Sequence, residues 1–293
     1  MRGAGLGLLL ALLASSCNAE GAPDPRSGGT TSDPDGTPLV VTDAAGRRIE
    51  LERAPERVVS LVPSATRTLA ALGLESRLVG RTDYDTLPPL DTLPSVGGGL
   101  QPSLERLVAL RPDLVVRFEG RSDRGTPEQL DRMGIPHLAV RPDGIEDVRG
   151  MIRTLGRAGG ASPAADSLVA RIDSALSHVA ATIEGRPRRS VAFVLGGEPP
   201  WVAGPGTYID QLIEAAGGRN AFADLAELYG PVSPETFVAR PIDLILAAEG
   251  SDVRLKGIDL PVRRVPGAVE RPGPGLGEAA WALARAIHPE AFR

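Results

Sequence analysis

Apolar and polar residues follow two kinds of pattern after residue 38. Residues 39–51, LVVTDAAGRRIEL, alternate apolar and polar on both sides of an Ala-Gly pair, which predicts a β-hairpin. Residues 57–73, RVVSLVPSATRTLAALG, begin with a continuous apolar run and predict a buried strand, a tight loop and a helix. We expect Ser64 to cap this helix and Gly73 to end it.

The alternation of strand and helix continues along the chain. LVGRTDY (78–84) predicts a second strand, and residues 102–118 predict a short helix, a proline break and a strand of β-branched residues. Residues 128–140 repeat the order of helix, glycine and strand. Because such βα alternation places strands side by side with helices on their faces, the pattern predicts an α/β fold with a parallel sheet.

One long helical pattern occupies residues 162–185, SPAADSLVARIDSALSHVAATIEG. Ser162 fits an N-cap, Pro163 fits the first turn and Gly185 fits the stop. At 1.5 Å per residue the helix extends about 30 Å, enough to cross a small domain. Its apolar residues lie on one stripe at helical spacing: Leu168, Ile172, Ala175, Leu176, Val179 and Ile183.

A second series of strands and helices starts at residues 190–200, and it contains an internal echo of the first. Residues 103–116, SLERLVALRPDLVV, align without a gap on residues 233–246, SPETFVARPIDLIL. Each copy predicts a Ser-capped helix that leads into a buried strand. Together with the matching order of elements, the echo predicts two similar α/β lobes that enclose a ligand cleft at the carboxyl ends of their strands.

These patterns divide the chain into five parts. The expected parts are a signal peptide (1–17), a disordered tether (18–38), an N-terminal lobe (39–161), a connecting helix (162–185) and a C-terminal lobe (186–293). The tether is rich in Gly, Pro, Ser, Thr and Asp and has no apolar cluster, so it cannot bury enough surface to order itself.

The N-terminus resembles a bacterial lipoprotein signal. Residues 6–13 form an apolar run that is too short to span a bilayer, and the small residues Ala14-Ser15-Ser16 precede Cys17, the only cysteine of the chain. Such a signal implies that Cys17 becomes the lipid-bearing first residue of the mature protein, which is then periplasmic or on the cell surface. The alternative is an ordinary secretory signal followed by an unrelated cysteine.

Charge and residue content argue against several other classes. The net charge of −5 and the lack of a basic run with interleaved aromatics argue against nucleic acid as a partner. With its one cysteine in the signal region, the mature domain has neither a thiol nucleophile nor a thiolate metal site. No two of the three histidines are spaced as metal ligands. GLGEAA (275–280) mimics a dinucleotide-binding motif, but no strand precedes it. An exported α/β enzyme that uses the cleft, or an adhesin, is the alternative class.

Several longer stretches carry a family resemblance: residues 57–84, residues 93–116, EQLDRMGIPHLAV (128–140) and IDQLIEAAGGRNAF (209–222). They resemble the periplasmic binding proteins for cobalamin and iron–siderophores that serve ABC importers. The resemblance covers residues 39–293 and implies two Rossmann-like lobes with parallel-rich sheets, joined by one rigid helix. It also implies a monomer without enzymatic activity, whose partners are a small-molecule chelate and a permease dimer with its ATPase subunits.

The resemblance implies one permease-docking glutamate on each lobe. By motif these residues are Glu105 and Glu235, which occupy matching positions in the two copies of the internal echo. In this family they pair with arginines of the permease, and a pseudo-twofold pair of carboxylates suits a two-fold permease dimer. The alternative is that each glutamate only complements the dipole at its own helix N-terminus.

Residues at predicted strand ends and in loops are the candidates for ligand binding. Three glycines at 97–99 are expected to let a planar ligand approach the backbone, and Trp201 lies in the Pro/Gly-rich loop GGEPPWVAG (196–204). For each aromatic residue the alternative is packing in a lobe core, which is favoured for Trp281 in the final helix. The full set is Pro63, Ser64, Ala65, Tyr84, Gly98, Gly99, Phe118, Trp201, Tyr208, Tyr229, Glu270 and Arg271.

The stretches VGRTDYDTLPP (79–89) and LGGEPPWVAG (195–204) are most similar to the cobalamin branch, so cobalamin is the expected ligand. A ferric siderophore is the alternative and would use clustered arginines, for which Arg117, Arg121, Arg124 and Arg271 are available. Haem is a further alternative, with Tyr84 or Tyr208 as the iron ligand. No resident cofactor and no bound metal are expected.

Overall fold

A computed structural model describes residues 38–120, 125–253, 257 and 259–292. The predicted signal peptide, Cys17 and all of the tether except Pro38 lie outside these residues. The described chain begins with the antiparallel hairpin of β1 (Leu39–Thr42) and β2 (Arg48–Leu51), which confirms the first prediction from the hydrophobic pattern. None of the helices in the described ranges is both long and apolar enough to cross a membrane.

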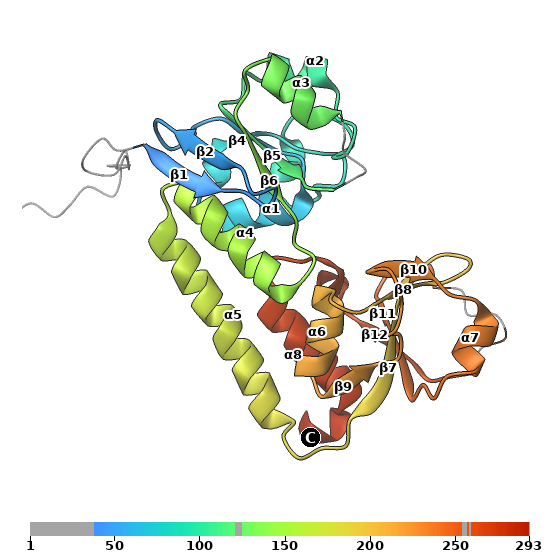
Figure 1. Ribbon diagram of the computed structural model, residues 1–293. Helices are drawn as coiled ribbons and strands as arrows, with labels where there is room; N and C mark the ends of the chain where they lie inside the picture. The colour runs from blue at the N-terminus through green and yellow to red at the C-terminus, as the bar shows by residue number, and fades with distance from the viewer. Residues whose placement is uncertain (1–37, 121–124, 254–256, 258, 293) are drawn as a thin grey trace, which may run out of the picture. The chain divides into compact units, whose positions relative to one another are not determined.

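The first sheet has four parallel strands in the order β4, β3, β5, β6. Their bounds are Leu78–Gly80 for β4, Val58–Ser60 for β3, Leu114–Phe118 for β5 and His137–Val140 for β6. Helices α1 (Pro63–Ala71) and α4 (Ile145–Ala158) cover one face, and α2 (Leu104–Ala109) and α3 (Thr126–Arg132) cover the other (Figure 1).

Strand periodicity explains why both faces of this sheet are covered. Successive side chains of a strand point to opposite faces, so a strand that is apolar throughout needs a partner on each side. Val58 and Val116 pack in the core cluster that includes α1 and α4. Val59 and Val115, their chain neighbours, pack in a separate cluster with Leu107 of α2 and Leu130 of α3.

The long predicted helix is α5, Ser162–Thr182, which lies between the two sheets in the chain and packs against α4 and α8. Ala161 rather than Ser162 is the N-cap, so that detail of the prediction is wrong. Only residues 159–161 connect α4 to α5, and this short turn makes Ser162 the first helical residue. At the other end the helix stops three residues early, and Gly185 follows in the left-handed region at φ 74°.

The second sheet is mixed, with the strand order β10, β8, β7, β11, β12 and with β9 also paired to β7. Strands β7 (Arg189–Gly196), β9 (Gly218–Asn220), β11 (Leu244–Ala248) and β12 (Val262–Val265) are mutually parallel where they pair. Strands β8 (Trp201–Ala203) and β10 (Tyr229–Pro231) add an antiparallel edge. Helices α6 (Tyr208–Ala215) and α8 (Leu276–Ile287) cover one face, and α7 (Pro234–Val238) lies on the other (Figure 1).

The largest core cluster contains residues of both sheets. It includes Val58 of the first sheet, Phe193 of the second, and Val148, Ile172 and Leu283 of helices α4, α5 and α8. Smaller clusters lie under α2 and α3 and under α7. The inner helices therefore join the two sheets through one continuous apolar core.

The two segments of the internal echo, residues 103–116 and 233–246, also have the same local structure. Ser103 and Ser233 are the N-caps of α2 and α7, and each hydroxyl accepts a hydrogen bond from the backbone N–H three residues later at 3.4 Å. Asp113 and Asp243 precede β5 and β11, and each carboxylate accepts a backbone N–H beside the start of the neighbouring strand. The two copies therefore have the same caps and the same anchoring of the following strand.

Candidate ligand-binding site

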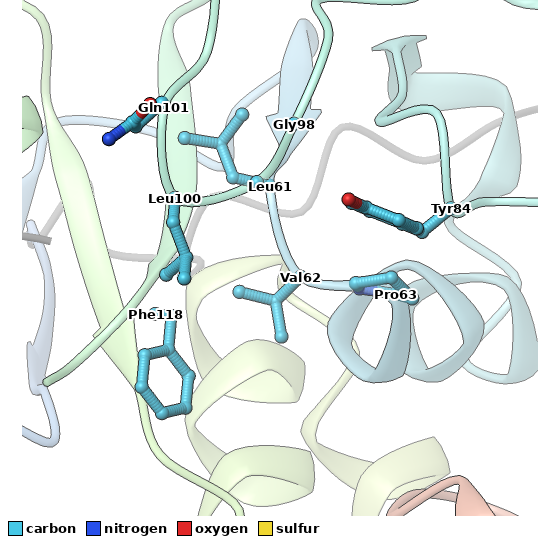
Figure 2. A pocket seen from close by; sticks show the side chains of 9 residues that line it. Leu61, Val62, Pro63, Tyr84, Gly98, Leu100, Gln101 and Phe118 are labelled. Carbon is cyan, nitrogen blue, oxygen red and sulfur yellow. The ribbon is translucent and has the colours of Figure 1, made fainter. Parts of the chain in front are cut away.

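An apolar cavity of about 690 Å³ opens at the carboxyl ends of β3 and β5 (Figure 2). These strand ends are neighbours, because Ser60 of β3 is in register with Val116 of β5 and the next residue, Leu61, donates its N–H to Val116 O at 2.8 Å. The lining residues are Leu61, Val62, Pro63, Tyr84, Gly98, Gly99, Leu100, Gln101 and Phe118.

Five of these lining residues are in the predicted set, namely Pro63, Tyr84, Gly98, Gly99 and Phe118. The four others, Leu61, Val62, Leu100 and Gln101, were missed. Leu61 and Val62 continue the apolar run of β3, so nothing in the sequence separates them from the core. Leu100 is the better signal, since it is a large apolar residue directly after three glycines, and its side chain is 43% exposed.

Tyr84 faces the apolar wall from the opposite side of the cavity. Figure 2 shows its ring across from Leu100 and Phe118, with the hydroxyl directed inward. The Tyr84 side chain is 71% exposed, and its backbone N–H donates to Thr82 Oγ1 at 3.3 Å. The buried carboxylate of Asp85 accepts hydrogen bonds from Thr82 N and Oγ1 at 2.9 and 2.7 Å. This turn positions the exposed ring of Tyr84 at the rim of the cavity.

Gly99 has a structural role that differs from the predicted one. A Cβ atom built on Gly99 would lie 2.2 Å from the carbonyl oxygen of Leu61, whereas one built on Gly98 would meet nothing closer than Gln101 O at 4.0 Å. Gly99 is therefore required where the loop presses against the end of β3. Gly98 lines the cavity and has no such close neighbour, and its role in ligand approach stays a prediction.

A second pocket of about 360 Å³ adjoins the cavity and shares Pro63 and Tyr84 with it. Residues from two distant parts of the chain form it, the α1 region and the segment after β12. The pocket is lined by Pro63, Ser64, Arg67, Tyr84, Thr86, Glu270, Arg271 and Pro272. Ser64, Glu270 and Arg271 were predicted as ligand contacts. Arg67 and Thr86 were not predicted. For Arg67 the reason is that an arginine one turn into a helix has no sequence signature of its own.

The first turn of α1 differs from the prediction. The helix begins at Pro63 with Val62 as N-cap, so Ser64 is a helical residue and the prediction that it caps the helix is wrong. Proline fits the first position because its missing N–H has no acceptor there. Ala65 is fully buried in the core, so its side chain cannot line the pocket as predicted.

The aromatic candidates of the second lobe do not line either pocket. Tyr208 is the first residue of α6 and is 3% exposed, so the prediction that it lies in a loop is wrong. Its burial raises the pKa of its hydroxyl, and nearby Tyr229 and Glu270 add to this rise. Tyr229 lies in β10 rather than in a loop and is half-buried. Trp201 starts β8 opposite Pro231, and its side chain is 47% exposed.

Of the remaining arginine candidates, Arg117 lies within the described residues and is buried. Arg117 is 3% exposed, donates to Glu119 Oε2 at 3.0 Å and to His137 Nδ1 at 3.0 Å, and so belongs to a buried network. Arg121 and Arg124 lie outside the described residues. Within the described ranges, no group of three His, Cys, Asp or Glu side chains is arranged to hold a metal ion.

Glu105 and Glu235 lie in the first turns of α2 and α7, and both are exposed. The Ser233 hydroxyl is hydrogen-bonded to the Glu235 carboxylate and lowers the pKa of that residue, which keeps it charged. Exposed valines follow each glutamate by three residues, with Val108 44% and Val238 70% exposed. Each lobe therefore presents a carboxylate and an apolar side chain together.

The fold and the open cavity define a two-lobed solute-binding protein. Residues 58–260 match the periplasmic binding protein family, and the chain belongs to this family. The ABC transporter substrate-binding lipoprotein YvrC of Bacillus subtilis is 29% identical over 277 residues, 87% of each chain. A cobalamin-binding protein of Halobacterium salinarum is 33% identical over 225 residues, which are 73% of this chain and 60% of that protein.

The solved structures agree on the fold. The periplasmic haem-binding protein RhuT from Roseiflexus sp. RS-1 superposes with a TM-score of 0.69 at 27% identity, over 80% of this chain and 99% of that one. The family consists of binding proteins, so this chain is a binding protein and not an enzyme. Its class is the substrate-binding protein of an ABC importer, whose partner is an ABC permease.

Proposed function

We propose that this protein captures cobalamin or a related corrinoid outside the cytoplasm and delivers it to an ABC permease. The observation that carries the proposal is the cavity of about 690 Å³, whose apolar wall of Leu61, Val62, Leu100 and Phe118 faces the exposed ring of Tyr84. Ligand sites are typically concave, largely apolar and of this size. A flat, bulky chelate has apolar faces that such opposed walls can cover.

Relatives that are named for corrinoids support this proposal. The Halobacterium protein named as cobalamin-binding is 33% identical, and a Salmonella typhimurium vitamin B12-binding protein is 29% identical over 202 residues. We infer that Trp201, exposed at the start of β8, contributes an aromatic contact from the second lobe. We also infer that a lipid on Cys17 holds the protein at the membrane, since the relative YvrC is named as a lipoprotein.

Haem or a ferric siderophore is the second candidate. Haem-binding structures are 25–27% identical to this chain. The exposed phenol of Tyr84 at the cavity rim is a group that can ligate ferric iron. Haem or a siderophore would occupy the same cavity as a corrinoid. The two candidates are distinguished by which ligand binds.

Ligand titration of purified residues 39–293 tests the proposal. Cyanocobalamin should quench tryptophan fluorescence, and the stability of the protein should rise as RT ln(1 + [L]/Kd). Replacing Tyr84 by Ala should weaken binding about 10-fold or more, because it removes an aromatic wall. Val262→Ala, at an exposed apolar residue of β12, is the matched control and should leave affinity unchanged. Binding of haemin but not of any corrinoid would select the second candidate.

A further inference from the structure

The first turns of α4 and α6 meet where the two lobes come together. Ile145, the first residue of α4 in the N-terminal lobe, donates its backbone N–H to Oε1 of Gln211 in α6 at 2.7 Å. Tyr208, the first residue of α6, donates its backbone N–H to the carbonyl oxygen of Asp143 at 2.6 Å. Figure 1 shows the ends of these two helices side by side. Each helix therefore finds the acceptor for its first N–H in the other lobe.

A glycine at the start of α4 explains why this helix uses an acceptor from the other lobe. The first four N–H groups of a helix have no acceptor inside it. Gly144 is the N-cap of α4 and has no side chain to accept one, so the Ile145 N–H depends on Gln211. The fit is close, since a Cβ built on Gly144 would lie 3.2 Å from Nε2 of Gln211 and 3.3 Å from the carbonyl oxygen of Gly206. A side chain at residue 144 would therefore press against the other lobe.

Carboxylates on both sides compensate the charge of this contact. Two helix N-termini that meet bring two positive dipole ends together, which is unfavourable unless negative charge lies beside them. Asp147 in the first turn of α4 and Asp210 in the first turn of α6 each accept a backbone N–H from the loop before their own helix, at 2.8 and 2.9 Å. Burial raises the pKa of the Tyr229 hydroxyl, and the charge of Asp143 raises it further, so this carboxylate of the N-terminal lobe lies near the C-terminal lobe.

The contact between α4 and α6 bears on the ligand site because the smaller pocket is lined by both lobes. Pro63 of α1 lines it from one lobe and Glu270, after β12, from the other. Burial, Tyr229 and Glu270 together raise the pKa of the Tyr208 hydroxyl, so the buried side chain of Tyr208 approaches Glu270 while its backbone N–H is held by the N-terminal lobe. A shift of α6 away from α4 would therefore change the width of the pocket.

We propose that Gln211 is a positioning residue for ligand retention, whose amide oxygen holds the N-terminus of α4 against α6 and so fixes the spacing of the two lobes around the ligand. The shared apolar core sets the general arrangement of the lobes, and the Gln211 contact sets the final width of the cleft. This inference rests on the proposed function, because it concerns release of the same ligand. Loss of the contact should let the lobes separate and the ligand leave sooner, whereas entry into the open cavity should not change.

Distances between spin labels on the two lobes test the contact without any ligand. Residues 39–293 contain no cysteine, so Arg132→Cys and Ala239→Cys give one labelling site in each lobe. Both positions are exposed, Arg132 at the end of α3 and Ala239 directly after α7. Pulsed electron paramagnetic resonance on the labelled protein then gives the distribution of distances between the lobes.

Three variants in this labelled background separate the contact from general packing. Gln211→Met keeps the length of the side chain but removes the amide oxygen, so the distances should become broader and longer than in the labelled parent. Gly144→Ala should have the same effect, because its methyl group presses against Gln211 and Gly206. Glu214→Ala, at an exposed residue of the same helix α6, should keep the parental distances. Parental distances in Gln211→Met would overturn the proposal and would show that the apolar core alone fixes the lobes.

Binding kinetics test the consequence for the ligand. With cyanocobalamin, or with haemin if that is the ligand that binds, Gln211→Met should raise the dissociation rate constant about 5-fold or more, as expected for the loss of one hydrogen bond. The association rate constant should stay within about 2-fold of the parent, and Glu214→Ala should change neither. An unchanged dissociation rate constant in Gln211→Met would contradict the proposal. If neither ligand binds, the proposed function fails, and the label distances still decide whether Gln211 holds the lobes together.

Discussion

At the scale of single residues, the neighbouring glycines Gly99 and Gly98 have different roles. Close packing requires glycine at Gly99, whereas Gly98 has open space around it. A Cβ on Gly99 would lie 2.2 Å from Leu61 O, and a Cβ on Gly98 would have no atom closer than 4.0 Å. Backbone atoms cannot move aside as a flexible side chain can, so the loop at residue 99 must shift if it gains a methyl group.

Gly99→Ala should therefore lower the free energy of unfolding by about 1–3 kcal/mol, whereas Gly98→Ala should change it by less than about 0.5 kcal/mol. Urea unfolding followed by circular dichroism measures both. The loop also forms the cavity wall, so ligand affinity should fall in Gly99→Ala. Equal stability of the two variants would show that the loop moves aside freely.

His137 is a buried histidine that is better read as structural than as functional. Arg117 Nε donates to its Nδ1 at 3.0 Å, and its Nε2 lies 2.9 Å from Asp131 Oδ1 and 3.1 Å from Nη1 of Arg47. Burial lowers the pKa of His137, and repulsion by Arg47 and Arg117 lowers it further against the opposing effect of Asp131. The folded protein thus favours the neutral ring.

Because the pKa is lower in the folded state, the unfolded chain takes up a proton first as the pH falls below the ordinary value of 6.5. The stability that depends on neutral His137 is complete above this pH and is lost as the pH falls toward the folded pKa, with a slope of at most about 1.4 kcal/mol per pH unit. His137→Gln should have a smaller slope between pH 6.5 and pH 5 in urea titrations. His178→Gln, at an exposed residue of α5, should keep the parent slope, and a parental slope in His137→Gln would refute this reading.

The candidate site could be predicted from the sequence where residues follow strand ends. Tyr84 and Phe118 lie at the ends of predicted strands, and parallel strands end at one edge of their sheet. Arg67 could not be predicted in this way, because only the folded chain shows that it lines the same pocket as Arg271. Tyr208 was misplaced for a related reason: Thr207 caps α6, so the helix starts at Tyr208 and buries it.

At the scale of elements, glycines set how closely α5 approaches its two neighbours. A Cβ on Gly156 of α4 would lie 2.4 Å from the Cβ of Ala165 in α5, and one on Gly277 of α8 would lie 2.8 Å from the Cβ of Ala175. These glycines let the helix axes come close, which extends the apolar contact along both sides of α5. The connecting helix is therefore held by two neighbours.

Gly156→Ala should destabilise the protein by about 1–3 kcal/mol, because the added methyl group overpacks the α4–α5 contact. Gly150→Ala, in the same helix but with nothing within 4 Å of the new atom, should stabilise it by up to about 1 kcal/mol through helix propensity. Thermal and urea unfolding give both values. Stabilisation of similar size in both variants would mean that α4 and α5 can separate without cost.

Helix existence was predictable, while helix ends were not. The predicted apolar stripe of α5 runs at helical spacing, and three of its six residues, Leu168, Ile172 and Val179, are buried. Its N-cap was assigned wrongly because a serine beside a proline fits both the cap and the first turn. The antiparallel edge of the second sheet was also not foreseen, since β8 and β10 are only three residues each.

At the scale of the whole molecule, the repeated helix–strand units place one carboxylate and one exposed valine on each lobe. We propose that Glu105 with Val108, and Glu235 with Val238, contact the two halves of the permease. The carboxylates supply attraction to cationic side chains, and the valines supply apolar area that is otherwise left in water.

The double variant Glu105→Ala/Glu235→Ala should retain ligand affinity and lose uptake in cells that depend on this importer. Each single variant should lose less than the double variant, since each removes one of two attachment points. Glu75→Ala, at an exposed residue of the turn at Glu75–Arg77, is the control and should leave uptake unchanged. Full uptake by the double variant would remove the docking assignment.

The single apolar core that joins both sheets through α4, α5 and α8 bears on how the molecule can come apart. Residues of both sheets pack in this one core, so unfolding of one lobe would expose apolar residues of the other. We therefore expect the two lobes to unfold together, in one calorimetric transition rather than in two. Fragments produced by cleaving the chain near Gly185 should each stay largely unstructured when alone and recover helical signal only on mixing. The two lobes would then form a single cooperative folding unit.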